Sequence, residues 1–278
     1  MKIVFIADFF VEQILGGGEL NNEELITILQ EDGHTVQKIQ SHFVDRYFVE
    51  SNSRKKFIVA NFANLQQQAI NSLYDKEYII YEHDHKYLRS RDPSTYPDFK
   101  APVEELVNIK FYKNAGAVLC QSQFHLNIVK KNIDLDNLVN LSGNIWSLES
   151  LDLMKQNSHN KKTATCAIMD SSISHKNTAD AVKYCEATQR PYNLVKSSDY
   201  KTFLRELGSN ETFVFFPKTP ETLSRIVVEA RMMGMGVIVN KLIGATQEPW
   251  YKLKGDELIT HMHQKRETIK NIVVESLT

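Results

Sequence analysis

One segment, residues 212–239, reads as a complete strand–helix–strand unit and constrains the fold more than any other part of the chain. Its apolar run at 212–216 ends at Pro217, and a helical stretch then continues to Gly234, a residue suited to end a helix. A second apolar run follows at 237–239. A helix that connects two successive strands in this way is typical of parallel sheets, so the segment predicts an α/β protein.

The same alternation continues along most of the chain. A polar stretch at 155–162 predicts a surface loop, after which the pattern restarts. We therefore expect two facing Rossmann-like domains with a ligand cleft between them, residues 1–145 and residues 146–278, and a C-terminal helix that can pack back on the first domain. Strands are expected at 2–7, 35–39, 57–62, 78–81, 117–120, 138–141, 163–169, 192–195, 212–216 and 237–239, and further helices at 19–32, 65–74, 103–114, 124–132, 178–188, 199–207 and 261–275.

Charge and cysteine usage narrow the class of protein. The 278 residues carry 33 Lys and Arg against 34 Asp and Glu, and this balance argues against nucleic acid as a partner. Three cysteines without a Cys-x-x-Cys pair fit a reducing cytoplasm better than a disulfide scaffold. No apolar run approaches the roughly 20 residues that cross a bilayer. We expect a soluble, cytoplasmic protein with at most a peripheral membrane contact.

Two glutamates eight positions apart mark the candidate site. Glu221 is expected in the turn after the strand at 212–216, and Glu229 inside the helix that follows. The neighbours of Glu229 are apolar, so its charge is expected to be buried and to need a partner. N–H groups at the helix start hold phosphate and carboxylates accept hydrogen bonds from hydroxyls, which suits an anionic ligand with sugar hydroxyls. The alternatives are a solvent-facing Glu229 and a Glu221 favoured only by the helix dipole.

The spacing of these glutamates resembles the Glu–seven residues–Glu signature of retaining nucleotide-sugar glycosyltransferases. Further motifs match the same enzymes in order and rough spacing, and together they resemble glycosyltransferase family four. That resemblance covers most of the chain and implies the GT-B fold of two Rossmann-like domains. The further motifs are Gly16-Gly17-Gly18-Glu19 followed by Gly33-His34-Thr35-Val36, the run His175-Lys176-Asn177 before a helix, and the turn Gly244-Ala245-Thr246-Gln247-Glu248.

The resemblance implies a role for each residue of the donor site. Glu229 would hold the donor ribose hydroxyls, Glu221 would contact the transferred sugar, and Lys176 would neutralise the leaving diphosphate. The alternative for Lys176 is a solvated surface charge. Ser171 is a departure, because the family usually carries there an arginine that holds the diphosphate, and serine does not replace a guanidinium fork. Backbone amides at the helix start would complete the donor site, which includes Thr222, Leu223 and Ser224.

Two features of the N-terminal half are candidates for the acceptor side. Gly16, Gly17 and Gly18 would let the backbone approach a phosphate or sugar closely, or would only make the loop flexible. His83 and His85 follow the strand at 78–81, and strand geometry would aim both to one side at its carboxyl end. They are candidates for contact with the sugar or the acceptor. Structural histidines and a metal site are the alternatives, and no third metal ligand is evident.

The prediction is a retaining hexosyltransferase that moves a sugar from a nucleoside-diphosphate sugar to an acceptor hydroxyl, with no metal and no other cofactor. The acceptor stays open among a glycan, a lipid-linked sugar and a small molecule, and the neutral charge balance gives transfer to DNA bases low weight. Ser171 motivates one alternative, a non-catalytic nucleotide-sugar-binding module on the same fold. A nucleotide-sugar epimerase is another.

Overall fold

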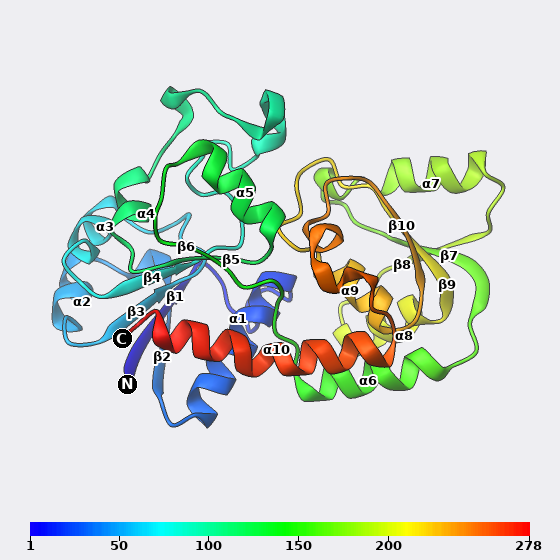
Figure 1. Ribbon diagram of the computed structural model, residues 1–278, viewed down its shortest axis with the longest axis horizontal. Helices are drawn as coiled ribbons and strands as arrows, with labels where there is room; N and C mark the ends of the chain where they lie inside the picture. Colours follow the sequence, from blue (N-terminus) through cyan, green and yellow to red (C-terminus); the bar gives the residue numbers. More distant parts are fainter. The chain divides into compact units, whose positions relative to one another are not determined.

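The computed structural model describes residues 1–278, and the contacts within it divide the chain into two compact units (Figure 1). Unit 1 comprises Met1–Ile145 and Arg266–Thr278, and unit 2 comprises Trp146–Lys265. Each unit is a parallel sheet with helices on both faces. No helix is both long enough and apolar enough to cross a membrane.

Unit 1 contains a six-stranded parallel sheet in the order β2-β1-β3-β4-β5-β6. The first strand pairs on one side with the second and on the other side with the third, so that Phe5 aligns with both Lys38 and Ile58. The chain thus reverses its direction across the sheet after β2. The strands are β1 (Lys2–Ala7), β2 (Thr35–Gln40), β3 (Lys56–Val59), β4 (Tyr78–Tyr81), β5 (Val118–Cys120) and β6 (Leu138–Asn140).

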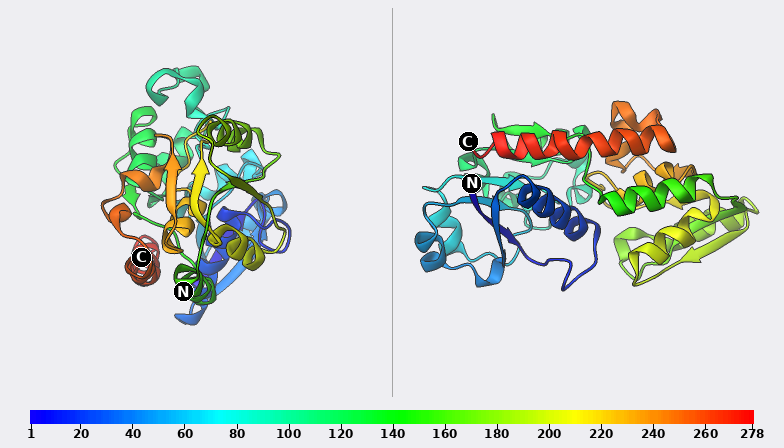
Figure 2. Two further views of the ribbon diagram at one scale, coloured as in Figure 1. Left: turned by 90° about the vertical axis from the view of Figure 1, so that its right-hand side faces the viewer. Right: turned by 90° about the horizontal axis from the view of Figure 1, so that it is seen from below.

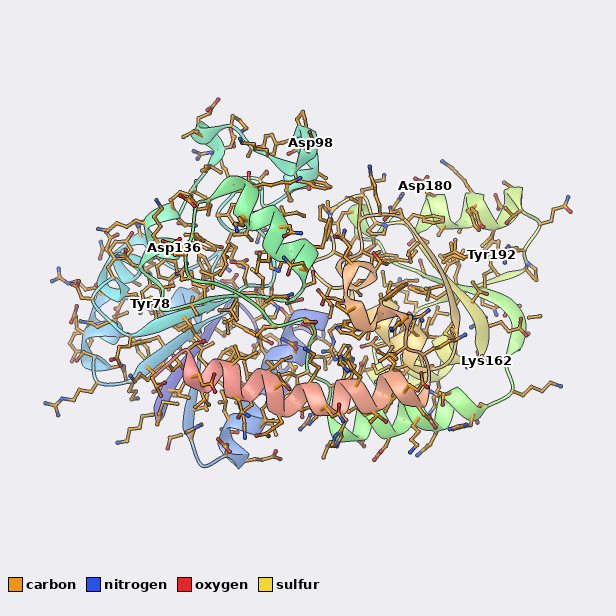
Figure 3. The ribbon with its side chains drawn as sticks, viewed as in Figure 1. Tyr78, Asp98, Asp136, Lys162, Asp180 and Tyr192 are labelled. Carbon is orange, nitrogen blue, oxygen red and sulfur yellow. The ribbon has the colours of Figure 1, made fainter.

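Each face of this sheet has its own core, because successive side chains of a strand point to opposite faces. Phe5 is fully buried on the face that α1 covers, together with Leu25 of that helix. Val4 is buried on the other face, against the remaining helices. Tyr78, labelled in Figure 3, belongs to that second core and donates its hydroxyl to the carbonyl of Phe111 at 2.6 Å. The helices of unit 1 are α1 (Gly17–Glu31), α2 (Arg46–Ser51), α3 (Gln67–Leu73), α4 (Ile109–Asn114) and α5 (Gln123–Asn132).

The C-terminal end of the chain packs on the α1 face of unit 1. Ile269 and Val273, on the second half of α10 (Asp256–Glu275), are fully buried in that core. An ion pair joins Lys270 to Asp32 at 2.9 Å, and a second joins Arg266 to Glu24. Figures 1 and 2 show the two termini close together in unit 1.

Unit 2 contains a four-stranded parallel sheet in the order β10-β9-β7-β8, in which Ala167 aligns with Phe213 and Phe213 with Val237. One face packs on α7, and the other packs on α6, α8 and α9; Figure 1 shows α7 on the opposite side of the sheet from α8 and α9. Its elements are α6 (Leu148–His159), β7 (Thr163–Met169), α7 (Thr178–Ala187), β8 (Tyr192–Val195), α8 (Tyr200–Gly208), β9 (Asn210–Phe215), α9 (Arg225–Met232) and β10 (Gly236–Val239).

The predicted fold class, two parallel α/β sheets and a C-terminal helix, is confirmed, and three local expectations were wrong. The polar stretch at 155–162 is not a loop up to His159, because Leu151 and Met154 anchor α6 in the core and the helix continues past them. The helix expected at 103–114 is interrupted at Asn108, whose φ of 59° is left-handed. The helix α2 was not predicted. Short 3-10 helices occur at Ser41–Phe43, Pro93–Thr95, Pro97–Phe99, Val103–Glu105, Ser174–Lys176, Gly244–Gln247 and Pro249–Lys252.

Candidate active site

The carboxyl edge of the unit 2 sheet has the geometry of a ligand site. The chain leaves β7 for β8 on one side and later returns to β9 on the other, so the strand order reverses between β7 and β9. Open α/β sheets bind ligands at the carboxyl ends of strands at such a point. The segments that follow these two strands contain Ser171, Lys176 and Glu221.

Lys176 and Glu221 form an ion pair at this edge, with 2.7 Å between Nζ and Oε1. Lys176 is 26% exposed and Glu221 is 14% exposed, so a ligand can still reach the pair. Two hydrogen bonds fasten the segments to each other. The backbone N–H of Lys218 donates to the carbonyl of His175 at 2.8 Å, and the carboxamide of Asn177 donates to the carbonyl of Phe216 at 2.8 Å.

Glu221 lies ahead of α9 and is held by the segment that follows β10. Its backbone N–H donates to the carbonyl of Leu242 at 2.8 Å, and its carbonyl accepts from the N–H of Gly244 at 2.9 Å. These bonds form a short parallel bridge with Ile243, which is fully buried. The backbone of Glu221 is therefore fixed by extended pairing, and the residue is not a first-turn acid of α9 as the dipole alternative supposed.

The three residues before α9 differ in what they offer a ligand. The side chain of Leu223 is fully buried, so only its backbone is available, and its carbonyl accepts from Ala245. Ser224 caps the helix with φ 75° and ψ 82°, a left-handed conformation that favours glycine. Its hydroxyl is buried and has no partner. Thr222 lies between Glu221 and Leu223, at the start of the same turn.

Glu229 lies in the second turn of α9 and is 3% exposed. Its Oε1 accepts hydrogen bonds from the indole N–H of Trp146 at 2.9 Å and from the hydroxyl of Tyr200 at 2.6 Å. Arg225 lies one turn earlier, with Nε 3.6 Å from the same oxygen. The buried carboxylate therefore has the partners that its burial requires, and a solvent-facing Glu229 is excluded.

Sequence reasoning missed these three partners of Glu229. The spacing of Arg225 and Glu229, four positions on one helix, was a usable signal for a pair. Trp146 and Tyr200 are 54 positions apart in the sequence and gave none. Only the packing of α6, α8 and α9 against one another brings them together.

Ser171 lies where the arginine was expected, just after β7. Its hydroxyl accepts a hydrogen bond from the N–H of Ile173 at 3.2 Å, and its own N–H donates to the hydroxyl of Thr178 at 3.2 Å. The side chain is thus used in the local turn. It supplies no positive charge to the edge of the sheet.

In unit 1 the glycine triplet begins a helix and is not wholly a loop. Gly16 caps α1, and Gly17 and Gly18 form its first turn. A β-carbon on Gly16 would lie 2.3 Å from Oε2 of Glu19, which folds back over the helix start. Burial raises the pKa of the Glu19 carboxyl. Gly16 therefore leaves room for the partly buried carboxyl of Glu19.

His83 lies beside this helix start, at the carboxyl ends of the strands. A β-carbon on Gly18 would lie 3.7 Å from Nδ1 of His83 and 3.7 Å from the carboxamide of Asn61, which follows β3. The two ring nitrogens of His83 lie 2.6 Å from Oδ1 of Asn22 and 2.5 Å from Nε2 of Gln121. Since an amide oxygen only accepts and an amide nitrogen only donates, these two contacts suit the tautomer that carries its proton on Nε2.

His85 has different surroundings from His83, although the strand pattern predicted that both would project to one side. It is 2% exposed, with Nδ1 2.9 Å from the hydroxyl of Tyr87 and its ring against His125. Burial lowers the pKa of His85 to about 4. His85 is therefore buried in unit 1, as the structural alternative for this histidine supposed.

A buried charged cluster surrounds this turn. Glu82 is fully buried, accepts a hydrogen bond from the hydroxyl of Tyr112 and pairs with Lys86 at 3.4 Å. Lys86 also pairs with Asp84. Burial raises the pKa of Glu82 to about 7. No group of three or more His, Cys, Asp and Glu side chains has an arrangement that could hold a metal ion.

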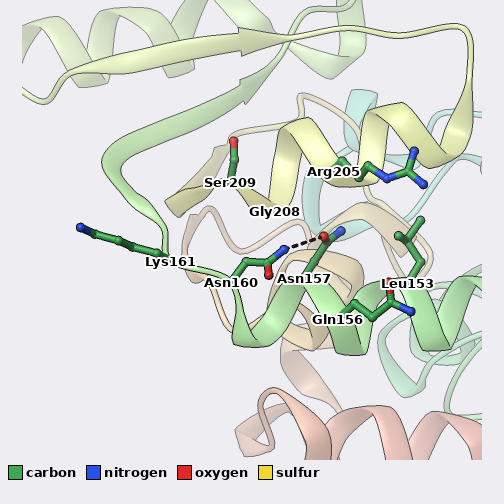
Figure 4. A pocket seen from close by; sticks show the side chains of 8 residues that line it. All are labelled: Leu153, Gln156, Asn157, Asn160, Lys161, Arg205, Gly208 and Ser209. Atoms are coloured by element: carbon green, nitrogen blue, oxygen red, sulfur yellow. Dashed lines mark hydrogen bonds between the residues drawn. The ribbon is translucent and has the colours of Figure 1, made fainter.

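A separate hollow of about 370 Å³ lies on unit 2 at the opposite edge of its sheet (Figure 4). It is formed by the last turns of α6 and α8, which lead into the amino ends of β7 and β9. Figure 3 shows Lys162, just before β7, on the other side of the unit from Asp180 in the first turn of α7. None of the predicted site residues lines this hollow, which is lined by Leu153, Gln156, Asn157, Asn160, Lys161, Arg205, Gly208 and Ser209.

No protein family model and no curated protein matches the sequence. Solved structures match its fold. Anabaena HepE in complex with UDP and glucose is 14% identical with a TM-score of 0.56, over 99% of this chain and 94% of that one. The catalytic domain of starch synthase IV from Arabidopsis thaliana, bound to ADP and acarbose, is 12% identical with a TM-score of 0.55, over 99% and 94%.

A third match is an alpha-glucosyltransferase in complex with UDP and a 13-mer DNA, 9% identical with a TM-score of 0.51, over 100% of this chain and 95% of that one. These structural neighbours are GT-B glycosyltransferases, and the chain has their fold. The predicted fold is therefore confirmed. Membership of family four and the retaining mechanism remain predictions.

Proposed function

We propose that the protein is a glycosyltransferase that moves a sugar from a nucleoside-diphosphate sugar to an acceptor hydroxyl. The observation that carries the proposal is the Lys176–Glu221 pair at the carboxyl edge of unit 2, ahead of the helix that contains the buried Glu229. The GT-B neighbours support it, since they were solved with UDP or ADP bound.

Each donor-site residue has a chemical role in this proposal. Glu229 accepts hydrogen bonds from the ribose hydroxyls, and the N–H groups at the start of α9 bind the diphosphate. Lys176 neutralises the charge that develops on the leaving diphosphate. Glu221, which shares the ammonium of Lys176 in the absence of ligand, contacts the transferred sugar. The ion pair between Lys176 and Glu221 therefore breaks when the donor binds, and each side chain then contacts the donor.

On the acceptor side, Gly18, Asn61 and His83 form the candidate subsite of unit 1. Asn61 and His83 would lie within van der Waals contact distance of a β-carbon added to Gly18, at the carboxyl edge of that sheet. Because both ring nitrogens of His83 already have protein partners, we assign the ring the role of shaping this subsite and not of removing a proton. His85 is closed off from solvent and is not part of this subsite.

We further propose that transfer retains the anomeric configuration and needs no metal, with Lys176 and the α9 amides in place of a divalent cation. Both statements rest on the family resemblance of the motifs.

Ser171 favours a second candidate, a module that binds nucleotide sugars without transferring them. Its hydroxyl is used in a local turn and its position supplies no guanidinium to the diphosphate. Nucleotide binding without consumption of the donor, in the presence of a broad set of acceptors, distinguishes the module from the transferase. Conversion of the donor sugar without any acceptor would identify an epimerase.

A thermal-shift panel tests the donor site. UDP, GDP, ADP, CDP and dTDP, and their common sugars, are added with and without a chelator, because a ligand that binds only the native state raises its melting temperature. We expect one nucleotide to raise the melting temperature regardless of chelator. A rise that the chelator abolishes would contradict the metal-free donor site, and no rise with any nucleotide would contradict the proposal itself.

A further inference from the structure

The starts of three helices of unit 2 converge on the carboxylate of Glu229. Trp146 lies two residues before α6, Tyr200 is the first residue of α8, and Arg225 is the first residue of α9. The three helices pack against one another on one face of the sheet. Side chains from three separate segments are thus directed at one acid, an arrangement that burial alone does not require.

All three contacts reach the same oxygen. Trp146 and Tyr200 donate to Oε1 at 2.9 and 2.6 Å, and the guanidinium of Arg225 lies 3.6 Å from it. A carboxylate oxygen accepts about two hydrogen bonds through its lone pairs, so Oε1 is saturated. Neither of these two hydrogen bonds uses Oε2. One half of a buried carboxylate is fixed by the protein, and the other half is left for a ligand.

The donors hold this arrangement over a wide pH range. Burial, reinforced by the nearby charge of Glu229, raises the pKa of Tyr200 well above its ordinary value, so its hydroxyl stays protonated and keeps donating. A guanidinium is always cationic. That of Arg225 stacks on the indole ring of Trp146, 4.4 Å from the ring centroid, which orients both groups.

We propose that Trp146, Tyr200 and Arg225 are positioning residues that turn Oε2 of Glu229 toward the donor ribose and so make the site select ribonucleotides over deoxyribonucleotides. The inference rests on the proposed function, because it assigns the ribose to Glu229. A ribose hydroxyl that donates to Oε2 satisfies it, whereas a deoxyribose leaves a buried charged oxygen without a partner. That loss corresponds to about a tenfold to hundredfold weaker binding.

The test compares dissociation constants by calorimetry for UDP and ADP and for their 2′-deoxy and 3′-deoxy counterparts. For wild type we expect at least one deoxy analogue of the preferred nucleotide to bind about tenfold more weakly or worse. Tyr200→Phe removes one donor to Oε1 and keeps the ring. It should weaken binding of the ribonucleotide about threefold to tenfold and leave the deoxy analogue almost unchanged, so the preference falls.

Matched variants separate positioning from folding. Tyr192→Phe removes the hydroxyl that lies 3.5 Å from Glu186, away from the site, and should leave the preference at the wild-type value. Arg225→Lys keeps the positive charge and should retain more of the preference than Arg225→Met. Each variant is first checked for a native circular dichroism spectrum and a cooperative thermal transition.

The outcomes are distinguishable. If Tyr200→Phe and Arg225→Met weaken ribonucleotide and deoxyribonucleotide equally, or change neither, the positioning role is wrong while nucleotide binding stands. If wild type binds the deoxy analogues as tightly as the ribonucleotides, the selection is wrong. If wild type binds no nucleoside diphosphate at all, the proposed function fails and the positioning inference falls with it.

Discussion

The ammonium of Lys176 lies 2.7 Å from Oε1 of Glu221, although the two residues are 45 positions apart and follow different strands of unit 2. The pair exists because β7 and β9 are neighbours in the sheet, so the segments after them meet at one edge. In the proposed transfer, the cation faces the leaving diphosphate and the acid faces the sugar.

Removing the cation should slow donor consumption with little effect on stability. We expect Lys176→Gln to lower kcat/KM for the donor about 100- to 1000-fold, because the leaving diphosphate loses its counter-charge. Stability should change by less than about 1 kcal/mol, since the pair is partly exposed. The measurement is the initial rate of nucleotide release from the donor that the thermal-shift panel identifies.

The matched control for this variant is Lys183→Gln. Lys183 is on α7, is 75% exposed and pairs with Asp180 at 3.5 Å. The Lys183→Gln variant should release nucleotide at the wild-type rate. A Lys176→Gln enzyme within twofold of wild type would contradict the role of Lys176.

Ser224 stores backbone strain at the start of α9. Both Ser224→Gly and Ser224→Ala remove the buried hydroxyl that has no partner, but only glycine adopts φ 75° without a penalty. We therefore expect the glycine variant to be more stable than the alanine variant by roughly 1 kcal/mol. Urea unfolding of the two proteins measures this difference directly. Equal stabilities, or a more stable alanine variant, would show that the turn is not strained.

The end of α10 should be needed for the stability of unit 1. Ile269 is fully buried beside α1, and Ile269→Ala should cost about 2–5 kcal/mol through lost burial and a residual cavity. Asn271→Ala, at an exposed position two residues away, should change stability by no more than about 0.5 kcal/mol. Chemical denaturation checks both values, and a similar small effect of the two substitutions would mean that the helix end is dispensable.

His85 should make the protein less stable in acid. Burial lowers its pKa from an ordinary 6.5 to about 4, so between these pH values the unfolded chain binds a proton at His85 and the folded chain does not. The contribution of neutral His85 to the free energy of unfolding is fully present above pH 6.5 and is lost as the pH falls toward 4. At roughly 1.4 kcal/mol per pKa unit, the loss amounts to about 3 kcal/mol.

The effect of Glu82 on the pH dependence of stability has the opposite sign. Its pKa is raised to about 7, which favours the folded state as the pH falls from 7 toward 4.5. The measured quantity is therefore the difference between wild type and His85→Gln in free energy of unfolding at pH 7 and pH 4.5. The variant should lose less stability than wild type over that range. His42→Gln, at an exposed position, should lose as much stability as wild type. Equal losses in all three proteins would show that His85 does not cause the acid sensitivity.

The sequence predicted the fold well because it depends on local patterns. Short apolar runs and amphipathic spacing identify strands and helices, and a parallel sheet follows from their alternation. The features that the sequence did not predict depend on side chains outside the segment itself. The polar residues 155–162 looked like a loop because the side chains that anchor α6, Leu151 and Met154, lie before them.

The site was predictable where its residues follow strands, and not where it depends on packing between helices. Lys176 and Glu221 were identified from motif positions that the topology brings to one edge. Tyr200 gave no signal, because its approach to Glu229 is set by how α8 lies on α9. The burial of His85 was not predicted either, because period-two reasoning does not apply beyond Tyr81, the last residue of β4.

A calorimetric titration of UDP and ADP into wild type and Glu229→Gln tests the account most directly, with Glu211→Gln as an exposed control on β9. We expect one of these nucleotides to bind wild type and the control alike. Glu229→Gln should bind that nucleotide at least about tenfold more weakly while its melting curve stays cooperative. Binding to Glu229→Gln as tight as to wild type, or no binding of either nucleotide to wild type, would contradict a donor site on unit 2.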